Sequence, residues 1–352
     1  AANITYHEQT DMDNIRKLRE VLKTLPAFAK DYFRAIEPTT STKTRISYAY
    51  DIRIFFQFLI SQNPSLAKIG IPNLNVSVLD QLKPIDIEEY MEYLKLYDSP
   101  NDQMTITNGE RGLKRKISSL RSFYTYYYKR QAIETNPVQL VDMPKIHDKA
   151  IIRLDAGETA ALLDYIEHCG DQLTGQRKAY YEKTKLRDLA IVTLLLGTGI
   201  RVSECVGLDV EDIDFRNNGI RLIRKGGSEM VVYFGPEVEK ALKDYLEARK
   251  AISPLEGHEH ALFYSTQRKR IGVQAVENLV KKYARAITTT KKITPHKLRS
   301  TYGTTLYQET GDIYLVADVL GHKDVNTTKK HYAAMDDARR RKAATAIRLR
   351  ED

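Results

Sequence analysis

The sequence predicts a mainly α-helical protein of two domains, with one small antiparallel sheet in the second domain. Three observations lead to this prediction. The chain has 352 residues, which suits two domains of ordinary size. Apolar residues recur at helical spacing along most of its length. A stretch at residues 136–148 carries two prolines and loses that periodicity, which is typical of a linker.

The first domain is predicted to be almost wholly helical over residues 1–148. Apolar positions at helical spacing predict four helices, at residues 11–36, 42–61, 85–96 and 109–130. The last of these is basic at its start and aromatic at its end. Its tyrosines at 124–128 are expected to lie in the core rather than to form a surface on which bases stack.

The second domain is predicted to be mostly helical around a small sheet. Two alternating segments, 219–224 and 229–234, flank the turn KGGS and predict a strand pair. The helices are expected at residues 156–168, 185–196, 236–251, 272–287, 295–309, 312–320 and 336–349.

Composition excludes several classes of protein. No apolar run approaches the roughly 20 residues of a membrane-spanning helix, and the first residues lack the pattern of a secretory signal. Two cysteines, Cys169 and Cys205, are too few for a disulfide framework, so we expect a reduced, cytoplasmic interior. The net charge of +9 favours a polyanionic partner such as nucleic acid, although many basic proteins bind none.

Arg201 and Lys225 have simple structural explanations when each is taken alone. Arg201 follows the helix break GTG and precedes Glu204 by three residues, which is the spacing of an ordinary i,i+3 ion pair. Lys225 lies in the turn of the predicted hairpin, where a solvated lysine is usual.

The segment TPHKLR is more informative. Thr294 can cap a helix whose first residue is Pro295, and His296 and Arg299 then project from one face. Both side chains can donate to a phosphate, and the amino terminus of the helix favours an anion. A surface pair on a capped helix would give the same pattern.

Two further candidates follow near the end of the chain. Gly321 is expected to cap a helix and to leave His322 exposed in the next loop. Tyr332 is expected on a short helix capped by Asn326 or Thr327. Since the chain contains 22 tyrosines, Tyr332 means little by itself.

Taken in order, these residues form a set of cationic hydrogen-bond donors and one hydroxyl nucleophile. Two arginines can bind the non-bridging oxygens of a phosphodiester and stabilise the charge that develops on them. A lysine or histidine can protonate the leaving 5′ oxygen, and another histidine can assist the phenol. Because a tyrosyl ester conserves the bond energy, ligation needs no nucleotide. We therefore predict strand transfer to a tyrosine, with no cofactor and no metal site.

The local sequences resemble one known family, the tyrosine recombinases or phage integrases. The words GTGIRVSEC, RKGGSE, PHKLRSTYGT and VLGHKDVNTTKKHY occur in that order. In the first domain, STKTRISYAYDIRIFFQFL and GLKRKISSLRSFYTYYYKRQAIETNPVQL are similar to the core-binding domain of Xer-type recombinases and transposon integrases. The resemblance implies a helical SAM-like core-binding domain and a mixed α/β, mostly helical catalytic domain. The implied boundaries are 1–37 for an amino-terminal extension, 38–143 for the core-binding domain, 144–151 for the linker, 152–335 for the catalytic domain and 336–352 for a carboxy-terminal helix.

The resemblance also implies a role for each candidate. Catalytic roles fall on Arg201, Lys225, His296, Arg299, His322 and Tyr332, with Glu204 in support. Tyr332 would be the nucleophile, and Lys225 the general acid toward the 5′ hydroxyl. Two features depart from the family pattern. Tyr332 lies one residue further from His322 than is usual, and Met230 stands where a Lys or Arg is common.

The partners that the resemblance implies are double-stranded DNA sites, three further copies of the chain in a tetramer, and in some systems a directionality factor. The two domains would clamp the duplex, with phosphate contacts expected from Lys43, Arg45, Arg111, Lys114 and Arg121. The basic tail at 336–352 could contact DNA, but docking on a neighbouring subunit is favoured because the tail has an apolar face.

The predicted function is site-specific recombination through a 3′-phosphotyrosyl intermediate and a Holliday junction. Its biological role would be integration and excision of a mobile element, with Xer-type dimer resolution as the alternative. We expect the enzyme in the cytoplasm, on the nucleoid when bound to DNA. A non-catalytic DNA-binding protein of the same fold, a type IB topoisomerase and a telomere-resolving enzyme are less consistent with the residues.

Overall fold

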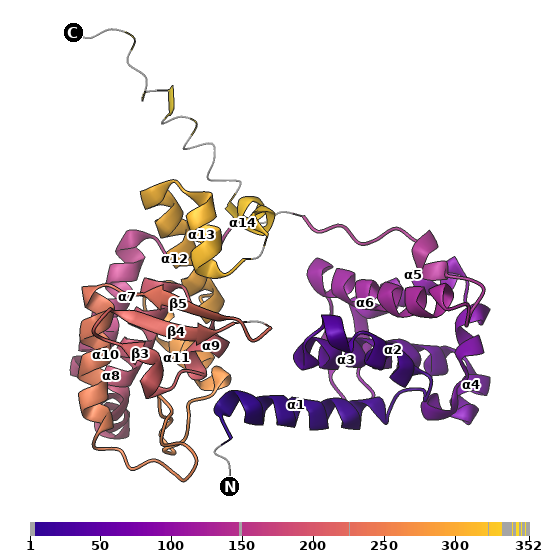
Figure 1. Cartoon of the computed structure of the whole chain (residues 1–352), viewed down its shortest axis with the longest axis horizontal. Helices are drawn as coiled ribbons and strands as arrows, with labels where there is room; N and C mark the ends of the chain where they lie inside the picture. Colours follow the sequence, from indigo (N-terminus) through magenta and orange to yellow (C-terminus); the bar gives the residue numbers. More distant parts are fainter. Residues whose placement is uncertain are drawn as a thin grey trace. The chain divides into compact units, whose positions relative to one another are not determined.

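The computed structural model describes residues 4–147, 150–224, 226–322 and 324–332, and the isolated residues 340, 343, 344, 346 and 349. The chain forms two compact units, residues 1–148 and 149–352 (Figure 1). The division falls within the segment predicted as a linker. The mainly helical fold with small antiparallel sheets is confirmed.

The first unit consists of six α-helices, four 3₁₀ turns and one short hairpin. The helices are α1 (Tyr6–Leu22), α2 (Ala29–Ala35), α3 (Thr42–Gln62), α4 (Pro64–Ile69), α5 (Pro84–Lys95) and α6 (Glu110–Lys129). The 3₁₀ turns are η1 (Glu37–Thr39), η2 (Ile71–Asn73), η3 (Val76–Gln81) and η4 (Pro137–Leu140). The strands β1 (Leu96–Asp98) and β2 (Thr105–Thr107) pair antiparallel. The hairpin was not predicted, because strands of three residues are too short to show alternation.

One predicted helix of this unit is two helices in the structure. The apolar spacing at 11–36 runs without a break, but α1 ends at Leu22 and α2 starts at Ala29. Pro26 lies between them, and proline has no N–H to continue a helical hydrogen-bond series. The α1 start is fixed by Thr5, whose hydroxyl accepts the N–H of Glu8 at 3.2 Å.

Aromatic side chains of α3 and α6 fill the core of the first unit. Phe56 and Phe123 meet edge to face with ring centroids 6.1 Å apart. Tyr124 is fully buried and donates its hydroxyl to the carbonyl of Leu79 at 2.9 Å. Tyr127 is also buried, whereas Tyr128 is exposed. The expectation that this tyrosine cluster belongs to the core is therefore confirmed for Tyr124 and Tyr127.

In the second unit, helices surround a three-stranded antiparallel sheet. Its strands follow the order β3 (Ile213–Asp214), β4 (Gly219–Ile223), β5 (Glu229–Tyr233). Its described helices are α7 (Ala156–His168), α8 (Gly175–Thr198), α9 (Val202–Val206), α10 (Pro236–Arg249), α11 (Val273–Ala284), α12 (Pro295–Thr310), α13 (Ile313–Leu320) and α14 (Val325–Tyr332), with 3₁₀ turns η5 (Cys169–Gln172) and η6 (Val210–Asp212). The helix predicted at 336–349 lies outside the described residues, apart from the isolated positions.

Helix α8 is the centre of the second unit and leads directly to the candidate site. It packs against α7, α10 and α12, and Ile191, Leu194 and Leu195 are completely buried. It starts earlier than predicted, because its first residues are polar and carry no apolar periodicity. Both cysteines are unpaired and buried. Among the described residues, no helix has the length and apolarity needed to cross a membrane.

Candidate active site

The site begins where α8 ends and a short loop leads into α9. Gly199 caps α8 with φ +67°, and a Cβ there would lie 2.2 Å from Tyr302. Arg201 precedes α9, and its backbone N–H donates to Oε1 of Glu204 at 2.7 Å. Its Nη1 lies 3.5 Å from Oε2 of Glu204, and its side chain is 40% exposed. The predicted i,i+3 pair is confirmed, and Arg201 still faces solvent.

Glu204 is shared between two arginines. Its side chain is only 6% exposed, and Oε2 also lies 3.4 Å from Nε of Arg224, the residue after β4. Burial lowers the pKa of Arg224, and the charge of Glu204 acts in the opposite direction. The sequence reasoning missed Arg224. Strand alternation could have found it, because Arg224 lies two residues after the buried Leu222 on the same face.

Arg299 ties two loops of the site together. It lies one turn after the start of α12 and is 5% exposed. Its Nη1 donates to the carbonyl of Gly199 at 2.6 Å, and its Nη2 to the carbonyl of Leu320 at 2.5 Å. His296 lies on the preceding turn and is exposed. Pro295 occupies the first turn as predicted, but the Thr294 side chain makes no capping hydrogen bond.

The loop between α13 and α14 carries His322. Gly321 caps α13 with φ +71°, as predicted. His322 was expected to be exposed, but it is partly buried because Nδ1 lies 2.5 Å from Oγ1 of the buried Thr328. The carboxylate of Asp324 accepts the N–H of Asn326 at 2.9 Å. Asp324, rather than Asn326 or Thr327, therefore caps the start of α14.

Tyr332 can be placed only in part, and Lys225 cannot be placed. Tyr332 is the last residue of α14, which packs against α13; its side chain is outside the described residues. Lys225 lies outside them altogether. The residue before it is described, and the N–H of Arg224 donates to the carbonyl of Ser228 at 2.8 Å.

These contacts bring four segments together: the α8–α9 loop, the end of β4, the start of α12 and the α13–α14 loop. They carry Arg201, Arg224, the His296–Arg299 pair and His322. Such a group of cationic and neutral donors fits a phosphodiester rather than an apolar ligand. In the described part of the chain, no group of three or more His, Cys, Asp or Glu side chains is placed to hold a metal ion.

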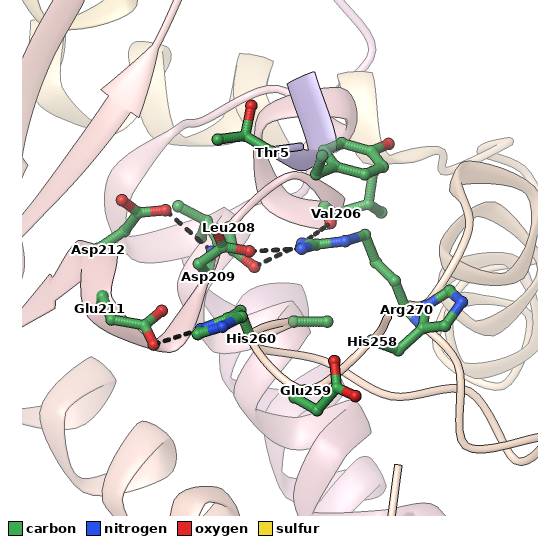
Figure 2. A network of polar contacts seen from close by, with 12 residues as sticks. Thr5, Val206, Leu208, Asp209, Glu211, Asp212, His258, Glu259, His260 and Arg270 are labelled. Carbon is green, nitrogen blue, oxygen red and sulfur yellow. Dashed lines mark hydrogen bonds and ion pairs between the residues drawn. The ribbon is translucent and has the colours of Figure 1, made fainter. Parts of the chain in front are cut away.

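A polar network fixes the far end of α9 (Figure 2). Arg270 donates through Nη1 to the carbonyls of Val206 at 3.1 Å and Leu208 at 2.8 Å, and it forms an ion pair with Asp209. Beside it, Nδ1 of His260 lies 2.7 Å from Oε1 of Glu211, which raises the pKa of His260. The network holds the short helix that positions Glu204. No pattern in the sequence had indicated it.

Gly321→Ala is expected to lower the stability of the second unit. A Cβ at this position would lie 2.1 Å from Nη1 of Arg224, and φ is +71°. We expect a loss of about 2 kcal/mol in the free energy of unfolding, measured in urea. Gly257→Ala is the matched control, because φ is +87° but nothing lies within 4 Å; it should cost about 1 kcal/mol. Equal losses would mean that Arg224 yields freely to the new methyl group.

The five expected DNA contacts, all in the first unit, fall into two groups by the exposure of their side chains. Lys43, Arg111 and Lys114 are exposed. Arg45 is buried, and its Nη1 donates to the carbonyls of Glu37 at 3.0 Å and Thr40 at 2.9 Å.

Arg121 is partly buried, and its Nη2 lies 3.4 Å from the carbonyl of Val138 and 3.3 Å from that of Val141. Arg45 and Arg121 thus use their guanidinium groups to hold the backbone. The five phosphate contacts stay a prediction, and Lys43, Arg111 and Lys114 are the three whose side chains are exposed.

Comparison with known proteins supports one family. Residues 153–339 match the phage integrase family. Tyrosine recombinase XerC of Caldanaerobacter subterraneus subsp. tengcongensis is 32% identical over 346 residues, which cover 95% of this chain and 90% of the relative. Tyrosine recombinase XerS of Streptococcus equi subsp. zooepidemicus is 29% identical over 344 residues, which cover 92% of this chain and 96% of the relative.

Solved structures show the same fold. XerH recombinase in a post-cleavage complex with palindromic difH DNA has a TM-score of 0.62 at 18% identity, covering 87% of this chain and 80% of the other. The Tn1549 transposon integrase in complex with transposon right end DNA also has a TM-score of 0.62, at 21% identity, covering 90% of this chain and 98% of the other.

Proposed function

The chain belongs to the phage integrase family and is a site-specific tyrosine recombinase that acts on DNA, and we propose that Tyr332 is its nucleophile. The observation that carries the phosphate site facing this nucleophile is the pair of hydrogen bonds from Arg299 to the carbonyls of Gly199 and Leu320. It draws the Arg201 and His322 segments toward α12, so that donors from distant parts of the sequence can meet one phosphate.

In the proposed reaction, the phenol oxygen of Tyr332 attacks the phosphorus and the P–O5′ bond breaks. Arg201, His296, Arg299 and His322 bind the non-bridging oxygens, where charge grows in the transition state. His296 accepts the phenol proton, and Lys225 gives a proton to the leaving O5′. The product is a 3′-phosphotyrosyl ester with a free 5′ hydroxyl. Attack of a 5′ hydroxyl from the partner duplex reverses these steps and joins the exchanged strands.

Strand exchange between two duplexes requires cooperation between subunits. We propose a tetramer on two synapsed sites, in which two subunits cut one strand each and form a Holliday junction that the other two resolve. The same proposal includes the domain boundaries that the family resemblance implies. It also places the enzyme in the cytoplasm, on the nucleoid when it is bound to DNA. A directionality factor is needed only where the forward and reverse reactions must be distinguished.

Two biological roles fit this chemistry, and one observation favours the second. The sequence suggested integration and excision of a mobile element, and the shared fold of the Tn1549 integrase is compatible with it. The relatives with about 30% identity over more than nine-tenths of this chain are named XerC and XerS. We therefore propose Xer-type resolution of chromosome or plasmid dimers as the leading role.

Sequencing the DNA bound by the chain in its source genome tests the role. Covalent complexes captured from cells should map to one short chromosomal or plasmid site if the protein resolves dimers. Capture at both ends of an excisable segment, with its circular form present, would instead assign the protein to a mobile element.

The carboxy-terminal tail is proposed to dock on a second copy of the chain. A groove between α7, α8, α10 and α12 has apolar walls that include Leu163, Leu189 and Leu306. The charged side chains that line it are mostly acidic. They are Asp164, Glu167, Glu237, Asp244 and Glu309, beside one lysine, Lys240. Residues 338–352 of the tail, ARRRKAATAIRLRED, combine basic residues with an apolar face, and Leu349 is 91% exposed. Charge and polarity are therefore complementary.

Deleting residues 336–352 is expected to impair recombination between two sites much more than binding of one site. The reason is that docking is needed only when subunits assemble. Gel-shift affinity and recombination of a two-site plasmid, measured on the same protein, check this expectation. If the deletion instead halved the salt dependence of single-site binding, the tail would be a DNA-contacting arm.

A further inference from the structure

Arg224 is a buried cation with an unusual environment. Its side chain is 6% exposed. Its Nε, Nη1 and Nη2 are all buried, and within the described part of the chain none of them makes a hydrogen bond. The nearest carboxylate oxygen with which it pairs is Oε2 of Glu204, at 3.4 Å. Burying a guanidinium with so few partners is costly, so a structural ion pair alone does not explain this arrangement.

The charge of Glu204 explains why a second arginine is useful. Glu204 holds Arg201 through its backbone N–H at 2.7 Å and its guanidinium at 3.5 Å. A carboxylate so close would cancel the charge of Arg201 as seen by an approaching phosphate, because opposite charges a few ångströms apart largely offset each other at longer range. With Arg224 on the same carboxylate, the charges of Arg201, Glu204 and Arg224 sum to one positive charge.

We propose that Arg224 is a positioning residue that neutralises Glu204. Glu204 can then orient Arg201 without cancelling its charge toward the DNA phosphate. The inference rests on the proposed function, because it assumes that Arg201 binds the phosphate at which the strand is cut. It extends the site by one residue that acts through another and does not touch DNA.

The packing around Arg224 keeps it in this indirect role. The backbone of Gly321 lies so close that a Cβ there would overlap Nη1. Among the described residues, Arg201, Asp318 and Tyr302 also act on the pKa of Arg224, each less than Glu204 does. The guanidinium nitrogens of Arg224 are buried, and Glu204 is the carboxylate with which they pair.

The test is a pair of substitutions measured by single-turnover cleavage of a nicked duplex. Arg224→Met keeps the length of the side chain and removes its charge, and we expect cleavage to fall about 100-fold. Adding Glu204→Gln removes the carboxylate charge but keeps an oxygen to accept the Arg201 N–H. The double variant should therefore cleave about tenfold faster than Arg224→Met alone. Both proteins lack the arginine, so lost packing affects them equally.

Three controls separate charge from folding. Arg221→Met, on the exposed face of the same strand, should leave cleavage unchanged. Arg224→Lys keeps the charge when the buried ammonium is protonated, so at about pH 6 it should cleave within about threefold of wild type at the same pH. A substrate with a neutral methylphosphonate at the cut position should reduce the defect of Arg224→Met, because less negative charge then needs stabilising. Thermal melting confirms that each variant is folded.

Several results would overturn the inference. A double variant as slow as Arg224→Met, or slower, would show that Glu204 is not the group through which Arg224 acts. At about pH 6, loss of activity in Arg224→Lys equal to that in Arg224→Met would show that shape matters rather than charge. Failure of the wild-type protein to form any covalent complex would instead remove the proposed function, and this inference with it.

Discussion

Tyr332→Phe is expected to bind DNA with unchanged affinity and to form no covalent complex. The substitution removes one oxygen at the end of α14 and leaves the cationic donors in place. Phosphate contacts supply most of the affinity for DNA, whereas the ester cannot form without the phenol oxygen. Gel shifts on intact duplex and denaturing gels of cleavage reactions measure the two properties separately.

Tyr314→Phe is the matched control for this substitution. Tyr314 lies on α13 and is 64% exposed, so losing its hydroxyl should change neither property. If Tyr332→Phe still formed adducts, the nucleophile would be another residue.

Arg299→Ala is expected to reduce cleavage by at least about 10³-fold. The guanidinium is proposed to stabilise charge on the phosphate, and in the free protein it also holds two loops at the site. Losing it removes one donor in the transition state and leaves the carbonyls of Gly199 and Leu320 without their partner. Single-turnover cleavage at saturating protein measures the rate.

The structural part of this effect can be measured without DNA. Two buried carbonyls that lose a donor should lower the free energy of unfolding by about 1–3 kcal/mol. Arg285→Ala, an exposed arginine just after α11, should alter neither stability nor cleavage. Near-normal cleavage by a destabilised Arg299→Ala protein would limit Arg299 to a structural role.

Local patterns in the sequence predicted much of the fold. Helix α7 occupies the predicted residues 156–168, and β4 and β5 lie within one residue of the predicted strand pair. The predicted helix bounds were wrong where apolar periodicity did not mark the ends of a helix. The polar first part of α8 was missed, and the apolar spacing at 11–36 concealed the break at Pro26 between α1 and α2.

The site shows the same division between local and long-range information. The Arg201–Glu204 pair and the Gly321 cap follow from short spacings and were predicted. The hydrogen bond from Arg299 to Gly199 joins residues 100 positions apart, which no local pattern encodes. Charge alone also does not distinguish a surface arginine from Arg45, whose guanidinium is buried and donates to two backbone carbonyls.

Covalent trapping in EDTA tests the central claim most directly. Wild-type protein would be incubated with nicked duplexes from the DNA that flanks its gene, labelled at either the 5′ or the 3′ end of the cut strand. We predict an adduct on a denaturing gel that retains the 5′ label only, since the protein holds the 3′ phosphate, and a DNA-bearing peptide that contains Tyr332. An adduct that retains the 3′ label, or tight binding with no adduct on DNA from any part of the genome, would contradict the account.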